Sequence, residues 1–121
     1  VETVNVDYHD RILAITSHLP HLIAYTIVGT ASDLESDLKN DVIKYSASGF
    51  RDFTRIASSD PIMWRDIFVN NSEAVLEMLQ RFNEDLSDLQ KAIRKKDGEK
   101  LHSFFSRTKS IRERIIDAGQ S

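Results

Sequence analysis

The sequence predicts an all-α protein, and three observations support that fold class. Glycine and proline are rare, with 4 and 2 among 121 residues. Apolar residues recur three and four positions apart, which is the period of one helix face, and the sequence contains no alternating strand pattern. The few turn-forming residues fall between these periodic segments, where helices are expected to begin and end.

A long helix is expected first, from near Asn5 to Val28, with Gly29 as its C-terminal cap. Pro20 lies inside it, and because proline lacks a backbone N–H and its ring clashes with the preceding turn, we expect a kink there. The stretch from Ile12 to Val28 is apolar but interrupted by polar residues, and it falls short of the length of about 20 residues that spans a membrane. We therefore interpret it as a core helix and expect no membrane span.

Shorter helices are expected next. Ser32, with Glu35 three residues later, forms a capping box that begins the second helix. After a turn, a third segment runs over Phe50–Ala57. Asp60 followed by Pro61 is an N-cap and a first-turn proline, so a further helix begins there.

The C-terminal part predicts an antiparallel helical hairpin. Ser72 caps a helix whose apolar residues form a heptad seam: Val75, Leu79, Phe82, Leu86, Leu89 and Ile93. A break at Asp97–Gly98 precedes a matching stripe: Leu101, Phe104, Phe105, Thr108, Ile111 and Ile115. Two such stripes joined by a tight glycine turn are typical of packed antiparallel helices. We expect one domain over residues 1–121, in which the long kinked helix packs with the shorter helices and the hairpin, and we expect a dimer.

Composition excludes several classes of function. The net charge of -3, with acids and bases interspersed, gives no nucleic-acid footprint. The absence of cysteine excludes disulfides and thiolate chemistry and fits a reducing compartment, so we expect a cytoplasmic protein without a signal peptide. The four glycines are far apart and follow no strand, so no dinucleotide- or phosphate-binding loop and no cofactor-binding residue are expected in this chain.

One group of polar residues lies on the kinked helix, in the segment Ser17-His18-Leu19-Pro20-His21. His21 shares a helix face with both Ser17 and His18, which precede it by four and three residues. Buried polar groups need partners, since an unsatisfied one costs about 1–3 kcal/mol. Residue types alone favour hydrogen-bonded core histidines over a metal site, because no carboxylate or cysteine nearby completes a zinc shell.

A second group lies in the segment Gly49-Phe50-Arg51-Asp52-Phe53-Thr54-Arg55. Arg55 follows Asp52 by three residues, and Phe50 and Phe53 form an apolar face. A planar guanidinium binds carboxylates bidentately, so an arginine held by its own aspartate and flanked by aromatic rings suits a small dicarboxylate. Residue types alone slightly favour the alternative, a surface helix with a weak ion pair.

Taken together, these segments resemble the prephenate dehydrogenase family. Four motifs appear in the order and spacing of that family: His9-Asp10, Ser17 to His21, residues 48–57 and residues 59–64. The resemblance extends through about Asn70 in motif and, beyond that, in helical layout. Several linked motifs in order are more specific than any one of them alone.

The resemblance implies the C-terminal domain of an enzyme that oxidatively decarboxylates prephenate to 4-hydroxyphenylpyruvate, or arogenate to tyrosine, in tyrosine biosynthesis. In this family an N-terminal domain, absent from this chain, binds NAD or NADP and carries the main catalytic histidine. The helical domain forms the homodimer and half of the substrate cleft, and tyrosine is a common feedback inhibitor. The chain alone is therefore expected to be inactive.

The resemblance also assigns six positions to the substrate site: Arg55, His21, His18, Ser17, Asp52 and Trp64. In the family, the arginine pairs with a substrate carboxylate and the second histidine of the His-Leu-Pro-His segment lines the pocket beside its two neighbours. Asp52 and Trp64 match residues that support the pocket, although the type of Trp64 alone is more typical of a core. No catalytic residue and no metal ligand are expected.

Two alternatives come from other classes. A non-catalytic helical dimerisation or interaction module would explain the heptad seam from Val75 to Ile93 and the missing cofactor loop. Such a module should ignore prephenate, tyrosine and 4-hydroxyphenylpyruvate, whereas a substrate domain should be weakly stabilised by one of them. A histidine-based metalloprotein is the other alternative, and metal analysis tests it.

Overall fold

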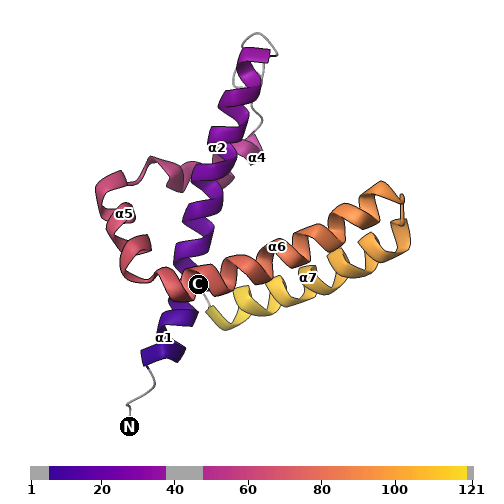
Figure 1. Ribbon diagram of the computed structural model, residues 1–121. Helices are drawn as coiled ribbons and strands as arrows, with labels where there is room; N and C mark the ends of the chain where they lie inside the picture. Colours follow the sequence, from indigo (N-terminus) through magenta and orange to yellow (C-terminus); the bar gives the residue numbers. More distant parts are fainter. Residues whose placement is uncertain (1–5, 38–47, 120–121) are drawn as a thin grey trace. The chain divides into compact units, whose positions relative to one another are not determined.

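The computed structural model describes residues 6–37 and 48–119, and within these ranges every regular element is helical. The predicted all-α class is confirmed. The elements are α1 (Val6–Leu13), η1 (Ala14–His18), α2 (Leu19–Asp37), α4 (Ser48–Phe53), η2 (Arg55–Ser58), α5 (Pro61–Asn70), α6 (Ser72–Arg94) and α7 (Gly98–Gly119), as Figure 1 shows. The chain divides into two compact units, Val1–Gln80 and Arg81–Ser121, and α6 crosses the boundary.

The first helical run is longer than the sequence predicts. Gly29 does not cap it, because no glycine in the described ranges has the left-handed backbone that a cap requires. Because the helix does not end at Gly29, Ser32, the expected start of a second helix, lies inside α2. Buried Ala24 and Ala31 lie on either side of the glycine, so packing keeps α2 helical through it. Most of the expected second helix, residues 38–47, lies outside the described residues.

The irregularity expected at Pro20 takes the form of a π-helical turn just before it. In η1 the backbone N–H of Leu19 donates to the carbonyl of Ala14, one residue further back than in an α-helix. Pro20 itself has no N–H to donate and its ring needs room beside the preceding turn. The wider π turn provides that room, and it places His18, its last residue, at a buried position.

The run Val6–Leu34 has 29 residues and is long and apolar enough to cross a membrane by length and composition. The same properties belong to the core helices of soluble proteins and to signal sequences. Much of this run is also exposed, because Ile12, Ile15 and Ile27 each leave more than a third of their surface uncovered. The contacts within the described residues therefore leave these apolar side chains partly uncovered.

The helix predicted over Phe50–Ala57 is instead split at Thr54, whose φ of -93° and ψ of 5° leave the α-helical region. The hydroxyl of Thr54 donates to the carbonyl of Phe50 at 2.7 Å, which satisfies the last turn of α4 and competes with helix continuation. The 3-10 turn η2 follows and packs against α2. The hydroxyl of Tyr25 on α2 donates to the carbonyl of Ser59 at 2.8 Å and anchors the end of η2.

The predicted start of α5 is confirmed. The carboxylate of Asp60 accepts a hydrogen bond from the backbone N–H of Ile62 at 3.0 Å, and Pro61 occupies the first turn. This N-cap fixes where α5 begins and therefore which of its side chains reach the first helical run. Trp64, one turn into α5, is the largest side chain of the core.

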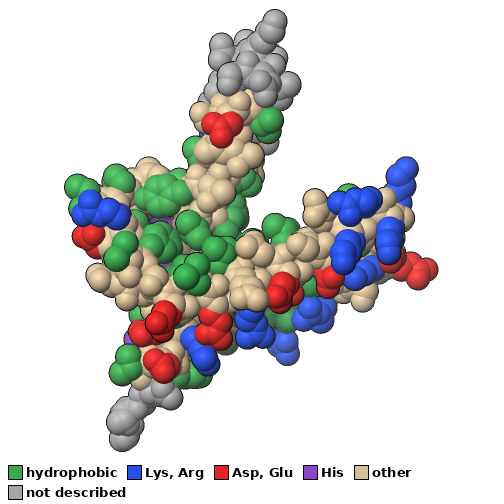
Figure 2. Space-filling view, viewed as in Figure 1, with side chains coloured by type: hydrophobic (Ala, Val, Ile, Leu, Met, Phe, Trp, Pro, Cys, Tyr) green, Lys and Arg blue, Asp and Glu red, His purple; other side chains and the backbone are tan. Residues whose placement is uncertain are grey.

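The described core of the first unit is narrow. Apart from Trp64 it consists of small or medium-sized residues: Ala14, Leu19, Ala24, Ala31, Ala74, Val75 and Met78. Large apolar side chains remain on the surface, and the space-filling view shows hydrophobic side chains gathered in green over this unit (Figure 2). Four of the large apolar residues are each more than 60% exposed: Val6, Ile62, Val69 and Leu76. A surface of this kind is typical of a chain that associates with another protein surface.

The second unit is the predicted antiparallel hairpin of α6 and α7 (Figure 1). Its predicted seam is partly wrong: Ala92 is buried, whereas Leu86 and Ile93 are 52% and 63% exposed. The heptad pattern is wider than one contact line, so part of it faces away from α7. Phe105 and Ile115 of α7 are likewise exposed, at 55% each.

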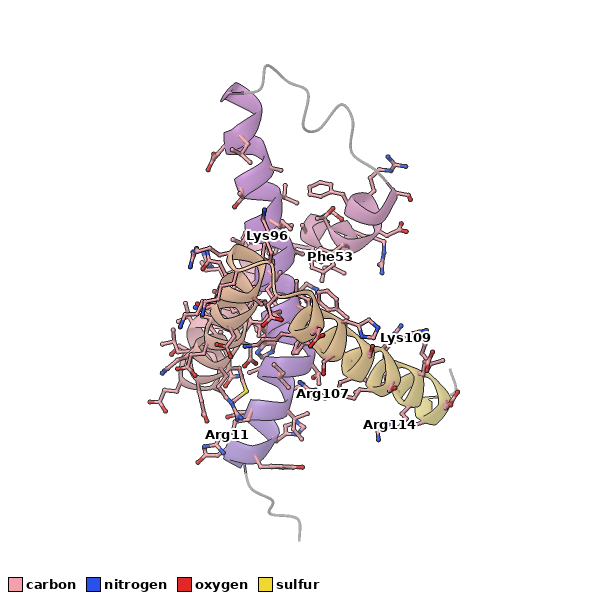
Figure 3. All side chains as sticks on the ribbon, turned by 90° about the vertical axis from the view of Figure 1, so that its right-hand side faces the viewer. Arg11, Phe53, Lys96, Arg107, Lys109 and Arg114 are labelled. Carbon is pink, nitrogen blue, oxygen red and sulfur yellow. The ribbon has the colours of Figure 1, made fainter. Side chains whose placement is uncertain are left out.

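The turn of the hairpin differs from the one predicted. The break is formed by Lys96, whose φ of 55° is left-handed, while Gly98 is already the first residue of α7. The N–H of Asp97 donates to the carbonyl of Ala92 and that of Lys96 to Ile93, at 2.8 and 3.0 Å, which is the Schellman pattern. Figure 3 labels Lys96 at this turn and Arg107, Lys109 and Arg114 along α7.

Replacing Lys96 by glycine should stabilise the chain by about 1 kcal/mol, because an L side chain in the left-handed region is strained and glycine is not. Urea unfolding followed by circular dichroism measures the change. The matched control is Lys95→Gly, one position earlier, which should destabilise the helix by up to about 1 kcal/mol. Equal destabilisation by both variants would contradict the assigned turn.

Candidate functional site

The two histidines predicted to share a helix face meet Trp64 of α5. The ring of His21 stacks on the indole, with centroids 3.8 Å apart and an interplanar angle of 19°. The ring of His18 meets the same indole edge-on at 5.9 Å, and it meets Phe68 at 6.3 Å. The structure therefore brings together three of the six predicted site residues in one aromatic cluster that joins η1, α2 and α5.

Ser17 enters the site through its backbone. Nδ1 of His21 lies 2.9 Å from the carbonyl oxygen of Ser17. A carbonyl only accepts hydrogen bonds, so Nδ1 carries the proton and donates it. In the neutral ring this leaves the lone pair on Nε2, and His21 can accept a hydrogen bond there from a ligand.

His18 is held by a residue that the sequence interpretation missed. Its Nδ1 lies 3.2 Å from Nδ2 of Asn71, the residue between α5 and α6. The same Nδ2 donates to the backbone carbonyl of Asp10 at 3.2 Å. Asn71 directly precedes Ser72, the serine expected to cap α6. This place beside a predicted helix start was the signal in the sequence that Asn71 lies at the junction between two helices.

The pKa of His18 lies below its ordinary value of 6.5. Burial is the main cause, since the protein interior disfavours the charged imidazolium, and the neighbouring His21 acts in the same direction. The carboxylate of Asp10 acts against them and raises the pKa. The net direction is downward, so His18 is neutral near pH 7.

Asp52 lies on α4 and Arg55 on η2, and neither element contributes a residue to this cluster. Both side chains are exposed. The expected ion pair between them is absent from the interactions of the described residues, because Thr54 ends the α-helix and the three-residue helical spacing is lost. Arg55 lies on η2, which packs against α2, and the anchoring residue Tyr25 lies one helical turn after His21. Its guanidinium has no hydrogen-bond or ion-pair partner within the described ranges.

Trp64 has one unusual feature. Its indole N–H is buried and has no hydrogen-bond partner among the described residues. The side chain borders a small cavity of about 220 Å³, with Tyr25, Pro61, Arg65 and Phe68. Phe68 follows Trp64 by four residues on the same helix face, a spacing from which its place in the cluster was predictable.

A metal centre has no support in the described part of the chain, where no three histidine or carboxylate side chains gather closely enough to hold an ion. The described glycines also have ordinary backbone angles, and no strand precedes them. These residues do not form a dinucleotide site of the usual kind.

Comparison with known proteins places the chain in a class of helical assembly domains. Residues 5–107 match the family model described as "Prephenate dehydrogenase, dimerization domain". The chain belongs to the prephenate dehydrogenase family and corresponds to this domain.

Relatives of known identity agree with this membership. The chain is 40% identical over 112 residues to a cyclohexadienyl dehydrogenase of Zymomonas mobilis, and 35% identical over 106 residues to a prephenate dehydrogenase of Lactococcus lactis. These matches cover 93% and 87% of the chain but only 38% and 29% of the two relatives. The chain thus spans little more than a third of these curated relatives at most.

Solved structures share the fold. A prephenate dehydrogenase of Aquifex aeolicus, in complex with hydroxyphenyl propionate and NAD+, superposes with a TM-score of 0.83 at 40% identity, covering 89% of this chain and 37% of that one. An arogenate dehydrogenase of Synechocystis gives a TM-score of 0.82 at 24% identity, covering 90% of this chain and 40% of that one. The second likeness concerns the fold alone.

The lowered pKa of His18 predicts that stability falls as the solution is acidified below pH 6.5. The unfolded chain then binds a proton that the folded chain resists, so the free energy of unfolding decreases with a limiting slope of about 1.4 kcal/mol per pH unit. Denaturant unfolding over this range should give a shallower slope for His18→Gln than for the wild type. Identical slopes would contradict the inference, whatever the absolute stability of the variant.

Proposed function

We propose that this chain is the substrate-binding and dimerising part of an NAD- or NADP-dependent dehydrogenase of tyrosine biosynthesis, which converts prephenate to 4-hydroxyphenylpyruvate or arogenate to tyrosine. The observation that carries the proposal is the guanidinium of Arg55, which has no hydrogen-bond or ion-pair partner among the described residues. Arg55 lies on η2, which packs against the helix that bears His21. Family membership supports it, as does the Aquifex aeolicus relative, a prephenate dehydrogenase solved with hydroxyphenyl propionate and NAD+.

The chemistry of the substrate fits these side chains. Prephenate carries two carboxylates and a ring hydroxyl. In the reaction a hydride leaves the hydroxyl-bearing carbon for the nicotinamide, the ring carboxylate leaves as carbon dioxide, and the ring becomes aromatic. The gain of aromaticity drives the step, so the protein mainly has to orient the ring and hold the carboxylates.

Each proposed site residue has a role that its geometry permits. Arg55 binds one substrate carboxylate through two parallel N–H donors. Exposed Asp52 orients the substrate as it approaches Arg55. Nε2 of His21 accepts a hydrogen bond, His18 supplies a donor, and Ser17 fixes the ring of His21 through its carbonyl. Trp64 holds both imidazoles in place.

The cofactor and the main catalytic histidine belong, in this proposal, to an N-terminal dinucleotide-binding domain of the whole protein. The described residues of this chain offer neither a glycine-rich turn nor a strand to carry one. The chain by itself, as a single domain over residues 1–121, is therefore inactive. Tyrosine, the aromatic product of the pathway, is proposed to act as a feedback inhibitor.

A homodimer accounts for the exposed apolar surface. Ile12, Ile15 and Ile27 lie on the first helical run, and we propose that a second copy of the chain covers this run, so that it does not cross a membrane. The whole protein is cytoplasmic and binds no nucleic acid in this proposal. The second candidate function is a non-catalytic dimerisation module, favoured by the exposed Leu86, Ile93 and Phe105 of the hairpin.

Replacing Arg55 by alanine in the native gene product should raise KM for prephenate by about 10- to 100-fold, which corresponds to the loss of one charge-assisted contact. KM for NAD should stay unchanged. Steady-state NADH formation measures both constants. Arg51→Ala, which removes the same charge from the adjacent turn, is the matched control and should change neither; an unchanged prephenate KM in Arg55→Ala would remove Arg55 from the site.

Dimerisation predicts that the melting temperature of the chain rises with protein concentration, because mass action favours the associated folded state. Melting curves at about 1 μM and about 100 μM should differ by several degrees. Sedimentation analysis of the same samples should give twice the monomer mass. A melting temperature independent of concentration, with a monomer in sedimentation, would contradict the dimer.

A further inference from the structure

Asn71 connects four helical elements with its backbone and side chain. Its N–H donates to the carbonyl of Ile67 at the end of α5, and its carbonyl accepts from Val75 in the first turn of α6, both at 3.0 Å. Its side-chain Nδ2 reaches the carbonyl of Asp10 on α1 and Nδ1 of His18 on η1, each at 3.2 Å. The NH₂ group of the side chain is therefore held by two acceptors.

The orientation of this amide follows from its partners. The carbonyl of Asp10 can only accept a hydrogen bond, so the atom of Asn71 that faces it must be the NH₂ group and not the amide oxygen. The same NH₂ group then donates its second proton to Nδ1 of His18. A donor at 3.2 Å requires a lone pair on Nδ1, and the single ring proton of neutral His18 must reside on Nε2.

We propose that Asn71 is a positioning residue that holds His18 in the neutral tautomer with its proton on Nε2, so that His18 presents a hydrogen-bond donor to the substrate. The substrate part of this inference rests on the function proposed above. No protein hydrogen bond to this Nε2 occurs within the described ranges, and His18 borders a cavity of about 450 Å³. The unused Nε2–H is the donor that we assign to a ligand in this cavity.

The neighbouring His21 has the opposite tautomer, because its Nδ1–H donates to the carbonyl of Ser17. Two imidazoles three positions apart therefore offer different groups at Nε2, a donor from His18 and an acceptor from His21. A ligand that carries both carboxylate oxygens and a hydroxyl can use the two together. The difference arises from the amide of Asn71 and the carbonyl of Ser17, which contact the two rings, and not from the histidines themselves.

A charged group near His18 acts against the neutral ring, and Asn71 acts with burial to keep the ring neutral. Asp10 of α1 and Asp66 of α5 line the same cavity of about 450 Å³ as His18, and a carboxylate favours the imidazolium. His21 of α2 and burial favour the neutral ring. A proton added at Nδ1 would face the NH₂ group of Asn71, donor against donor, so Asn71 opposes the protonation of His18 that the carboxylate of Asp10 favours.

The tautomer can be measured directly. In the full-length protein labelled with ¹⁵N-histidine, long-range ¹H–¹⁵N correlation distinguishes a protonated Nε2 from a protonated Nδ1. Near about pH 7.5, where free histidine is mostly neutral, His18 should show its proton on Nε2 and His21 on Nδ1. The His18→Gln spectrum assigns the signal. A proton on Nδ1 of His18 in the wild type would overturn the inference.

Asn71→Asp tests the residue itself, because it keeps the size and shape of the side chain and replaces the donor by an acceptor. His18 should then carry its proton on Nδ1, and kcat/KM for prephenate should fall about tenfold, with the acidic limb of its pH profile moved to higher pH. The matched control is Asn70→Asp, which adds the same charge at the adjacent exposed position. Asn70 lines the same cavity as His18, so the new carboxylate should move the acidic limb in the same direction, but the variant should keep the wild-type tautomer because the NH₂ group of Asn71 stays in place.

The outcomes separate this inference from the proposed function. If the native protein does not oxidise prephenate, the function is wrong, and the spectrum still decides the tautomer. If the enzyme is active but Asn70→Asp and Asn71→Asp change the His18 signal and the pH profile equally, the effect is that of a charge, and the positioning role of Asn71 is overturned. If Asn71→Asp does not fold, the wild-type spectrum alone remains decisive.

Discussion

The stacking of His21 on Trp64 is the contact on which the site in the first unit depends. It joins the long N-terminal helical run to α5, two elements separated in the chain by residues 38–60. Because the indole also receives the edge of His18, a single buried side chain sets the position of both imidazoles. The contact is possible only because Asp60 begins α5 where it does and the π turn before Pro20 sets the position of His18.

The narrow core explains why this fold suits an assembly domain. Alanines at the closest approaches let helices pack with little side-chain volume, and the large aliphatic residues are left for other surfaces. A family described as a dimerization domain is consistent with that distribution. In the proposed dimer, association would do for this chain what a thick core does for a larger single domain, since it would remove the apolar surface from water.

The two histidines of the site have few hydrogen-bond partners. Ser17 contributes only a carbonyl and Asn71 only an amide group, yet these two decide where each imidazole has its proton. Buried imidazoles without such partners would be costly and would lack a defined tautomer. The arrangement gives two chemically different groups from two identical residue types, one on η1 and one on α2, and the turn η2 that bears Arg55 packs against α2.

The sequence by itself determined the helical class, the start of α5 at Asp60 and Pro61, and the hairpin, because caps and helical periodicity are local properties of neighbouring residues. It failed at Gly29, Thr54 and Lys96, where packing or side-chain hydrogen bonds override the usual preference of the residue type. It selected His18, His21 and Trp64 by resemblance, but not their stacking. The place of Asn71 in the site, and with it the tautomer of His18, was decided only by the tertiary structure, since it depends on contacts between residues more than fifty positions apart.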